Sequence, residues 1–327
     1  MSESSSTVLV TGAAGFIGSH LADRLLREGH SVVGLDNFND FYDPRIKHGN
    51  LESFGRTDGF TLVEADIRDE AAVETAFGRH KPDAVVHLAA MAGVRSSIER
   101  PLLYADVNVQ GTTVLLEAAV RHGVGPFLFA SSSSVYGNNK DVPFSEEHRV
   151  ENPISPYAAT KRAAELLCHT FHHLHGLPVA CLRLFTVFGP RQRPDLAIAK
   201  FLRLVAAGQP IPVYGDGSTS RDYTFAGDIV AGIIGALDEW SRSGGFDIFN
   251  LGGSHPVTLN ELIDIIGEVT GLPVGREPRP PQPGDVQRTW ADVDKAAARF
   301  GYMPATDLRD GIAEQWEWTV KSGRLDP

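Results

Sequence analysis

Two residues of the chain, Tyr157 and Lys161, stand four positions apart in the run S-P-Y-A-A-T-K. Because a helix places residues i and i+4 on one face, the phenol and the ammonium can point into the same space. A free phenol has a pKa of about 10, and a neighbouring cation favours the phenolate, which brings the tyrosine closer to use as a base near neutral pH. An isolated Y-x-x-x-K is more often an ordinary amphipathic helix with a surface lysine, so the pair gains weight only from the rest of the chain.

A glycine-rich turn opens the chain. The apolar run 7–11 breaks into G-A-A-G-F-I-G, after which leucines recur with helical spacing. Gly12 and Gly15 allow the backbone to turn tightly and approach a pyrophosphate, and Gly18 lets the helix pack close to the strand. The spacing G-x-x-G-x-x-G departs by one residue from the usual dinucleotide fingerprint, so alone it is a weak signal.

An acidic residue, Asp36, closes the second apolar run, 31–35. This is about where an acid binds the adenosine ribose hydroxyls of a dinucleotide. Asn37 and Phe38 follow it where an arginine would suit a 2'-phosphate, which favours NAD over NADP. The alternative is an ordinary turn residue at the end of a strand.

The elements that must position these residues alternate along the chain. Short apolar runs predict strands over 7–11, 31–35, 61–64, 84–87, 127–130 and 179–184, and helical spacing predicts helices over 70–79, 103–122 and 157–175. The alternation predicts an α/β fold of Rossmann type, a doubly wound parallel sheet covered on both faces. After Gly189 the rhythm becomes irregular, with proline- and glycine-rich stretches at 190–222 and 272–284. We therefore expect an NAD-binding domain over 1–185, with a return segment near 223–250, and a smaller, irregular α/β substrate domain over 186–327.

Composition narrows the classes of protein. At 327 residues and 42% hydrophobic content the chain can build a large core, and the net charge of −11 offers no general attraction for nucleic acid or an anionic membrane. No apolar run approaches a membrane span and the first six residues lack a signal-peptide core, so the cytoplasm is the expected location. Cys168 and Cys181 stand in apolar surroundings, which favours buried thiols over a disulfide. His169 with His172 or His173 has a spacing that suits zinc, but nothing else completes a site, and no metal is expected.

In their order along the chain these motifs resemble the extended short-chain dehydrogenase/reductase family, in particular its nucleotide-sugar epimerases, dehydratases and decarboxylases. Besides the motifs above, the resemblance is carried by A-D-I-R-D, V-V-H-L-A-A, N-V-Q-G-T, A-S-S-S-S-V-Y-G, R-L-F-T-V-F-G-P-R, V-Y-G-D-G-S-T-S-R-D-Y and P-G-D-V, so that it covers nearly the whole length. It implies bound NAD and catalysis by Ser132, Tyr157 and Lys161, with Lys161 also binding the nicotinamide ribose.

The resemblance also implies the binding residues. Those for the cofactor are Gly12, Gly15, Phe16, Ile17, Gly18, Asp36, Asn37, Phe38, Asn39, Asp66, Ile67, Leu88, Ala89, Ala90, Asn108 and Phe185, together with Tyr157 and Lys161. Those for the substrate are Ser133, Ser134, Thr186, Arg193, Val213, Tyr214, Arg221 and Asp285. Among them Arg221 is similar to the residue that holds the nucleotide diphosphate. Gln282 stands where many relatives have arginine, so the diphosphate is expected to lean more on Arg221.

The residues beside Ser132 bear on the type of reaction. In the family's 4,6-dehydratases an Asp-Glu pair precedes V-Y-G, and the UDP-glucuronate decarboxylases usually carry a glutamate there. This chain has Ser133 and Ser134. Elimination therefore lacks its acid and base. Epimerisation needs only oxidation at C4 of the sugar, rotation of the keto-sugar and return of the hydride to its other face.

The substrate is narrowed by two further segments. Glucose and galactose epimerases of the family typically have asparagine where this chain has Thr186. The runs T-V-F-G-P-R-Q-R-P-D-L-A and D-N-F-N-D-F-Y-D-P are similar to those of UDP-glucuronate 4-epimerases. The hydroxyls of Ser133, Ser134 and Thr186 could satisfy the sugar carboxylate, and Arg193 could add a cation. For Arg191, and less readily for Arg193, the alternative is a solvated basic turn.

The resemblance thus implies an NAD-dependent isomerase that converts UDP-glucuronate to UDP-galacturonate through a 4-keto intermediate. A UDP-glucose 4-epimerase, a UDP-glucuronate decarboxylase and a non-catalytic NAD-binding regulator remain as alternatives. The helices over 103–122 and 157–175 carry apolar residues beyond the needs of one core face. Because the equivalent helices of the family pair across a dimer, we expect a homodimer.

Overall fold

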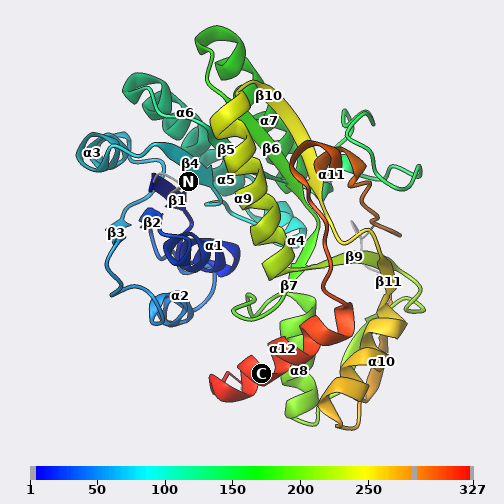
Figure 1. The fold of residues 1–327 in the computed structure, drawn as a ribbon. Helices are drawn as coiled ribbons and strands as arrows, with labels where there is room; N and C mark the ends of the chain where they lie inside the picture. Colours follow the sequence, from blue (N-terminus) through cyan, green and yellow to red (C-terminus); the bar gives the residue numbers. More distant parts are fainter. Residues whose placement is uncertain (1–4, 281–285, 325–327) are drawn as a thin grey trace.

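A seven-stranded parallel sheet forms the centre of the molecule, as seen in a computed structural model that describes residues 5–280 and 286–324 (Figure 1). The strand order is β10-β6-β5-β4-β1-β2-β3. The strands are β1 (Thr7–Thr11), β2 (Ser31–Asp36), β3 (Phe60–Glu64), β4 (Ala84–His87), β5 (Phe127–Ser132), β6 (Val179–Leu184) and β10 (Phe246–Leu251). The predicted doubly wound Rossmann-type sheet is confirmed, and β10 reaches it only after the chain has left it at β6.

Helices cover both faces of this sheet. On one face α1 (Phe16–Arg27) and α9 (Ala226–Ser243) pack on Val8 and Val10 of β1. On the other face α3 (Glu70–His80), α6 (Gly111–His122) and α7 (Pro156–His175) pack on Leu9 and Val33. Because both faces are buried, β4 and β6 are buried at every residue, which explains their unbroken apolar runs.

The start of α7 is fixed by its own sequence. Ser155 caps the helix, its side chain accepting a hydrogen bond from the amide of Ala158, and Pro156 occupies the first turn. Gly176 ends the helix in the left-handed conformation, with a φ of 69°. Tyr157 and Lys161 therefore lie in the first two turns, next to the carboxyl ends of the strands.

The predicted helix over 103–122 is interrupted. The structure has α5 (Pro101–Ala105), a π-helical turn at Asp106–Gln110, and then α6. This wider turn places Asn108 against the loop after β4, where it accepts from the amide of Met91 and donates to its carbonyl. A spacing of three to four residues in the sequence cannot reveal such a turn.

The C-terminal part has its own small sheets and core. Strands β7 (Thr186–Phe188), β9 (Ser220–Phe225) and β11 (Pro256–Thr258) form one sheet, and β8 (Ile211–Tyr214) pairs with β12 (Arg276–Arg279). Helices α8 (Ala197–Ala206), α10 (Leu259–Thr270) and α12 (Leu308–Lys321) lie together at the end of the molecule away from β3 and α3 (Figure 1). The remaining elements are α2 (Pro44–Leu51), α4 (Val94–Glu99), the 3-10 turn Ser133–Tyr136 and α11 (Asp294–Phe300).

Two further findings bear on the sequence-based expectations. Cys168 and Cys181 are buried free thiols on α7 and β6. Within residues 5–280 and 286–324, no helix combines the length and hydropathy needed to cross a bilayer.

Candidate active site

A cavity of about 630 Å³ opens at the carboxyl ends of β1, β2, β4, β5 and β6. Ligands of open parallel sheets bind at this edge. Of the residues predicted for cofactor, catalysis and substrate, those lining the cavity are Gly12, Gly15, Phe16, Ile17, Gly18, Asp36, Asn37, Asn39, Asp66, Ile67, Leu88, Ala89, Ala90, Ser132, Ser133, Ser134, Tyr157, Lys161, Phe185, Thr186 and Arg193. The strand order therefore brings together residues spread over most of the N-terminal half of the chain and beyond.

The glycine turn leaves no room for side chains. Gly12 has a φ of 71°, and a Cβ there would lie 2.9 Å from the amide nitrogen of Ala89. At Gly18 a Cβ would lie 2.1 Å from the carbonyl oxygen of Gly12. Gly15 is the N-cap of α1 and lines the cavity, and it has no side chain to accept hydrogen bonds from the first amides of the helix. This cradle fits a pyrophosphate at a helix N-terminus.

The carboxylate of Asp36 is held at the end of β2 by two backbone amides. It accepts hydrogen bonds from Ala14, at 3.1 Å, and from Phe38, at 2.9 Å. The buried ammonium of Lys47 lies 3.7 Å from the same carboxylate and 3.3 Å from Oδ1 of Asn39. Lys47 also lines the cavity and was not among the predicted residues, because a lysine in the short helix P-R-I-K-H-G-N-L looks like a surface residue.

Asp66 lines the cavity just after the end of β3. Hydrogen bonds from Arg68, together with one from Asn37, lower the pKa of Asp66 to about 2. Its carboxylate is therefore ionised over the whole physiological range, and it fixes the loop after β2 to the loop after β3.

The environment of Tyr157 differs from the predicted one. Burial raises its pKa, whereas a hydrogen bond with Ser132 and the positive charge of Arg193 lower it. Lys161 turns toward β5 instead: its ammonium donates to the carbonyl of Ala130 at 2.7 Å and lies 4.8 Å from the ring centroid of Phe129. In this structure the cation whose charge lowers the pKa of Tyr157 is Arg193, and a catalytic role of Lys161 stays a prediction.

Burial also acts on Lys161, lowering the pKa of its ammonium to about 8. The ammonium stays charged near neutral pH and sits on the cavity wall within one helical turn of Tyr157. A charged donor at this place can bind hydroxyl groups of a ligand.

Three serine hydroxyls gather at the end of β5. Ser132 lies at the start of the 3-10 turn, and its Oγ is 3.1 Å from both the amide nitrogen and the Oγ of Ser134. Ser133 lines the cavity beside them. None of the three side chains is acidic, so this corner supplies hydrogen bonds but no carboxylate.

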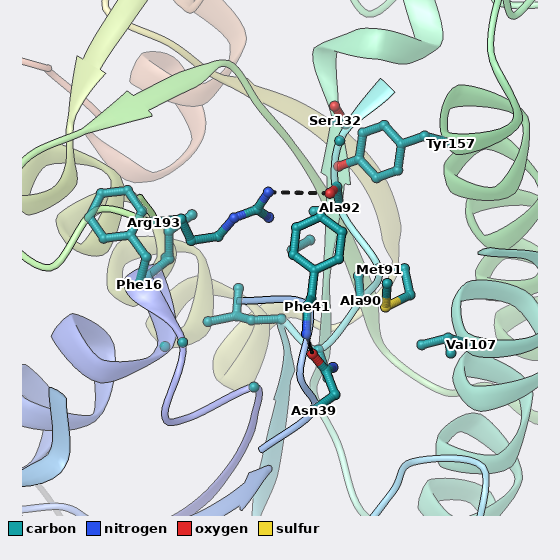
Figure 2. A pocket seen from close by; sticks show the side chains of 18 of the residues that line it. Phe16, Asn39, Phe41, Ala90, Met91, Ala92, Val107, Ser132, Tyr157 and Arg193 are labelled. Carbon is teal, nitrogen blue, oxygen red and sulfur yellow. Dashed lines mark hydrogen bonds between the residues drawn. The ribbon is translucent and has the colours of Figure 1, made fainter. Parts of the chain in front are cut away.

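Arg193 points into the cavity toward Ser132 and Tyr157 (Figure 2). Its Nη2 donates to the carbonyl of Ala92 at 3.3 Å and pairs with Asp195 at 2.6 Å, and its guanidinium lies 4.9 Å from the ring centroid of Phe41. Nε also bonds Asp195. The charge is therefore fixed in place beside Tyr157, and Phe41 and Ala92 are lining residues that were not predicted.

Arg191 behaves differently from its near neighbour. Its guanidinium donates to the carbonyl of Ser19 and to the hydroxyl of Ser53, and lies 3.4 Å from Asp23. It ties the loop after β7 to α1 and to the turn that follows α2, so the solvated basic turn considered for it is wrong.

Several predicted residues do not line the cavity. Phe38 is buried with its ring stacked on His48, at 4.2 Å between centroids, and its backbone has a positive φ of 48°. Asn108 acts through the loop that carries Met91. Val213 is packed in the core of the C-terminal part, so its side chain cannot meet a ligand there. Asp285 lies outside the described residues.

Tyr214 and Arg221 lie in the C-terminal part. Tyr214 lines a second cavity, of about 580 Å³, whose other lining residues include Lys200 and Arg279. The guanidinium of Arg95 lies 5.4 Å from the Tyr214 ring centroid, and Val94 next to it lines the first cavity, so the two cavities are neighbours. Arg221 donates to the carbonyl of Ser220 and lines neither cavity.

The histidine cluster has structural contacts. His172 bonds the carbonyl of Leu177 at 2.8 Å, and the His169 ring packs edge-on against Phe246. In the part of the chain that the structure describes, no three His, Cys, Asp or Glu side chains are grouped to hold a metal ion.

Comparisons with known proteins show the family to which the chain is similar. A family model described as the NAD dependent epimerase/dehydratase family matches residues 8–252. A UDP-glucuronate 4-epimerase of Thermodesulfobacterium geofontis is 41% identical over 318 residues, 97% of each chain. A probable UDP-glucuronate 4-epimerase of Rhizobium meliloti is 39% identical, over 95% of this chain and 96% of the relative.

Solved structures extend the likeness to three dimensions. A UDP-glucuronic acid 4-epimerase from Bacillus cereus, in complex with UDP-glucuronic acid and NAD, superposes with a TM-score of 0.91 at 34% identity, covering 97% of this chain and 99% of the other. A UDP-glucose 4-epimerase from Thermotoga maritima, with UDP-glucose, gives a TM-score of 0.89 at 33% identity and the same coverage. With a family model across most of its length and relatives of this identity over nearly all of it, the chain belongs to the NAD-dependent epimerase/dehydratase family.

Proposed function

We propose that this protein is an NAD-dependent isomerase that inverts C4 of UDP-glucuronate to give UDP-galacturonate. The observation that carries this proposal is the pairing, in one cavity, of Tyr157 and Ser132 with a fixed guanidinium at Arg193 and a corner of serines that bears no carboxylate. The Bacillus cereus relative holds UDP-glucuronic acid and NAD in the same fold.

The described residues fit NAD. The cradle of Gly12, Gly15 and Gly18 would take the pyrophosphate, Asp36 the adenosine ribose, and Asp66 with Ile67 the adenine. When bound, NAD supplies the hydride acceptor and donor for the sugar carbon. Lys47 lies beside Asp36 and would face the same ribose. Because the Asp36 carboxylate would repel a 2'-phosphate, we expect NAD in the purified protein; recovery of NADP would contradict this assignment.

The protein's own contribution to the chemistry is proton transfer. Tyr157 accepts the proton of the C4 hydroxyl as the carbon is oxidised, and returns it on reduction. Since burial raises the pKa of Tyr157, the phenolate must be stabilised by neighbours, and Ser132 and Arg193 are placed to do so. Lys161 holds a charged donor at the cavity wall, where it would bind the nicotinamide ribose.

The sugar carboxylate is assigned to Arg193 and the hydroxyls of Thr186, Ser133 and Ser134. The bonds of Arg193 described above use Nε and Nη2, and we assign Nη1 to the carboxylate. Charge-assisted hydrogen bonds of this kind are about twice as strong as neutral ones. A 4-keto uronate is a β-keto acid, and holding its carboxylate near the plane of the carbonyl opposes loss of carbon dioxide.

The nucleotide is assigned to the second cavity, which adjoins the first. Its ring at Tyr214 and its cations at Lys200 and Arg279 suit a base and a diphosphate, and Arg221 and Asp285 remain candidates for the same half of the substrate. On this basis residues 1–185 with the return segment 223–250 form the NAD-binding domain, and 186–327 form mainly the substrate domain.

We also propose a homodimer in the cytoplasm. Leu166 and Leu174 on α7, together with Leu102 on α5, expose 52%, 65% and 85% of their surface, which a paired copy of these helices would cover. Sedimentation of the purified protein would test the dimer.

The proposed reaction is tested by incubating the protein with UDP-glucuronate, UDP-glucose and their 4-epimers, without added NAD, and analysing the products. We expect interconversion of UDP-glucuronate and UDP-galacturonate. Turnover of the neutral hexoses alone would establish the second candidate, a UDP-glucose 4-epimerase, whose fold the Thermotoga maritima relative shares.

A further inference from the structure

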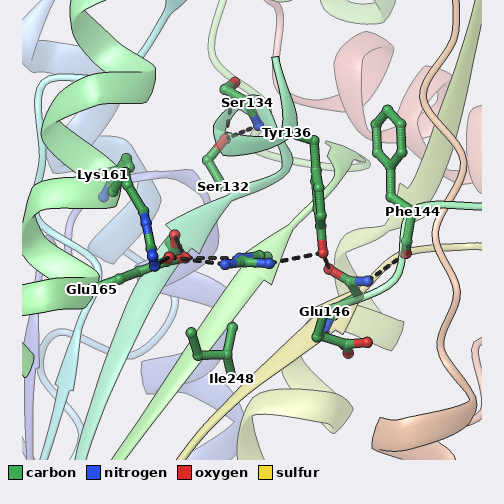
Figure 3. A network of polar contacts seen from close by, with 12 residues as sticks. Ser132, Ser134, Tyr136, Phe144, Glu146, Lys161, Glu165 and Ile248 are labelled. Atoms are coloured by element: carbon green, nitrogen blue, oxygen red, sulfur yellow. Dashed lines mark hydrogen bonds and ion pairs between the residues drawn. The ribbon is translucent and has the colours of Figure 1, made fainter. Parts of the chain in front are cut away.

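One buried ion pair is attached to both ends of the serine corner, Ser132–Ser134. Glu165 on α7 and Arg183 on β6 are each 1% exposed, and they form two parallel hydrogen bonds of 2.9 and 3.0 Å (Figure 3). Neither residue lines the cavity, so neither can touch a substrate.

The first attachment is made just before the corner. The hydroxyl of Ser131, at the end of β5, donates to Oε1 of Glu165 at 2.6 Å. Ser131 directly precedes Ser132, so this bond fixes the point at which the strand gives way to the 3-10 turn.

The second attachment is made just after the corner. Nη1 of Arg183 donates to the hydroxyl of Tyr136 at 3.0 Å, and the guanidinium lies 4.9 Å from the Tyr136 ring centroid. The same hydroxyl donates to Oδ1 of Asn250 on β10 at 2.7 Å. Asn250 in turn donates to the carbonyls of Phe144 and Asp292, so the end of the turn is tied to the edge strand and to the C-terminal part of the chain.

The pair also belongs to the helix that carries the catalytic tyrosine. Glu165 follows Lys161 by four residues and therefore lies on the same face of α7, one turn further from Tyr157. Its second oxygen, Oε2, accepts from Arg162 as well as from Arg183. A helix bearing the base and a turn bearing three hydroxyls are thus fastened to one charged centre.

A gain in folding free energy does not by itself explain this ion pair. Replacing a fully buried pair by apolar residues is often neutral or stabilising, because taking two charges out of water offsets most of their attraction. A satisfied buried network does, however, hold its members to one geometry. Here the ion pair joins α7 to β6, and its bonds to Ser131 and Tyr136 end on the residues on either side of the serine corner.

We propose that Glu165, Arg183, Ser131 and Tyr136 are positioning residues that set the serine corner against Tyr157. They keep Ser132 within bonding distance of the phenol and fix the direction in which Ser133 and Ser134 meet the sugar. The role of Ser133 and Ser134 in this statement rests on the proposed function, whereas the placement of Ser132 against Tyr157 does not.

The test uses Tyr136→Phe, which removes the hydroxyl but keeps the ring that stacks on Phe144 at 4.7 Å. Its matched control is Tyr302→Phe, another buried tyrosine, whose hydroxyl donates to the carbonyl of Gly252 at 3.0 Å and not to the ion pair or its partners. Both proteins are studied as purified holoenzyme. For Tyr136→Phe we expect kcat to fall about tenfold with KM changed less than about twofold, because displacement of reacting groups by a fraction of an ångström acts on the chemical step.

A second measurement does not depend on turnover. Hydrogen exchange of the amides over 132–137 should become faster in Tyr136→Phe, by about tenfold, and stay unchanged in Tyr302→Phe. Ser131→Ala should act in the same direction, and the double variant Ser131→Ala/Tyr136→Phe should lose less than the product of the two single losses, since both bonds act through one ion pair.

The proposal is overturned if Tyr136→Phe and Tyr302→Phe give the same kcat and the same exchange rates, or if the two single losses multiply. These outcomes are separable from failure of the proposed function. If the wild-type protein epimerises only neutral hexoses, the exchange rates and the kcat for those sugars still decide whether the corner is positioned by the pair.

Discussion

The cofactor half and the sugar half of the cavity are held in place by different means. In the cofactor half, the carboxylate of Asp36 accepts hydrogen bonds from two backbone amides, so the protein itself satisfies this polar group. The absence of side chains at Gly12 and Gly18 allows close contacts between backbone segments. In the sugar half, the hydroxyls of Ser132 and Ser134 bond each other and Arg193 is balanced against Asp195. The rigid backbone of the cofactor half suits a cofactor that stays bound. The side-chain contacts of the sugar half suit a substrate that must enter, turn and leave.

The largest effect is expected where the two halves meet. Tyr157→Phe removes the proton acceptor but keeps the ring, so turnover should fall by at least ~10²-fold while NAD stays bound. Turnover and the NAD content of the purified variant are the two measurements. Near-normal activity would mean that the hydride chemistry is organised without this phenol.

The substitution Gly18→Ala is expected to disrupt the glycine turn of the cofactor half. The added Cβ would lie 2.1 Å from the carbonyl oxygen of Gly12, so the turn must open, and we expect loss of bound NAD together with about 2 kcal/mol or more of unfolding free energy. Gly78→Ala is the matched control. Its Cβ would meet only His122, at 3.7 Å, inside α3, and it should stabilise the protein by roughly 0.5 to 1 kcal/mol. Equal melting temperatures for the two variants would show that the turn is not closed as described.

In the sugar half, Arg193→Ala removes the cation assigned to the sugar carboxylate, and Thr186→Val removes one of the hydroxyls assigned to it. Loss of a charge-assisted bond should weaken binding of UDP-glucuronate by roughly tenfold or more, with a smaller effect on UDP-glucose, and raise the share of decarboxylated pentose product. Affinity for both sugar nucleotides and the ratio of pentose to galacturonate are measured. Arg191→Ala serves as control, since its guanidinium packs on α1 and not on the cavity. If neither quantity moves, the carboxylate is held elsewhere.

The smallest effect concerns acid stability near the cofactor half. His87, at the end of β4, is fully buried between Thr11 and Thr112, and burial lowers its pKa to about 3. The unfolded chain binds this proton near pH 6.5 and the folded one does not, so the contribution of His87 to stability is present above pH 6.5 and is lost as the pH falls toward 3. His87→Gln should flatten the dependence of unfolding free energy on pH over this range. If the slope of unfolding free energy against pH is unchanged in this variant, other groups cause the loss of stability at acid pH.

Much of the fold could be predicted because parallel strands that are buried on both faces consist of unbroken apolar runs. The residues lining the cofactor half could be predicted because they directly follow those runs. The bounds of β1, β4 and β6 agree with the predicted ones residue for residue. The π-helical turn around Asn108 and the positive φ of Phe38 could not be predicted, since both depend on local backbone geometry and not on composition.

The sugar half was harder to predict for a physical reason. Arg191 and Arg193 are two residues apart in one polar turn, yet one packs on α1 and the other enters the cavity. Arg191 pairs with Asp23, which only the folded chain brings near, whereas Arg193 pairs with Asp195 two residues further along the chain. Lys47 and Phe41 arrive in the same way, on a segment whose path across the cavity the sequence does not specify.

The late arrival of β10 has a consequence for synthesis on the ribosome. Until residues 246–251 emerge, β6 is the open edge of the central sheet, and the chain from 185 to 245 must be made first. At about 5–20 residues per second this leaves an unpaired parallel strand exposed for several seconds. An open edge of this kind can pair with another chain. Nascent chains that stop before β10 should therefore be the aggregation-prone species, and a chaperone that covers β6 during this interval would raise the yield of folded protein.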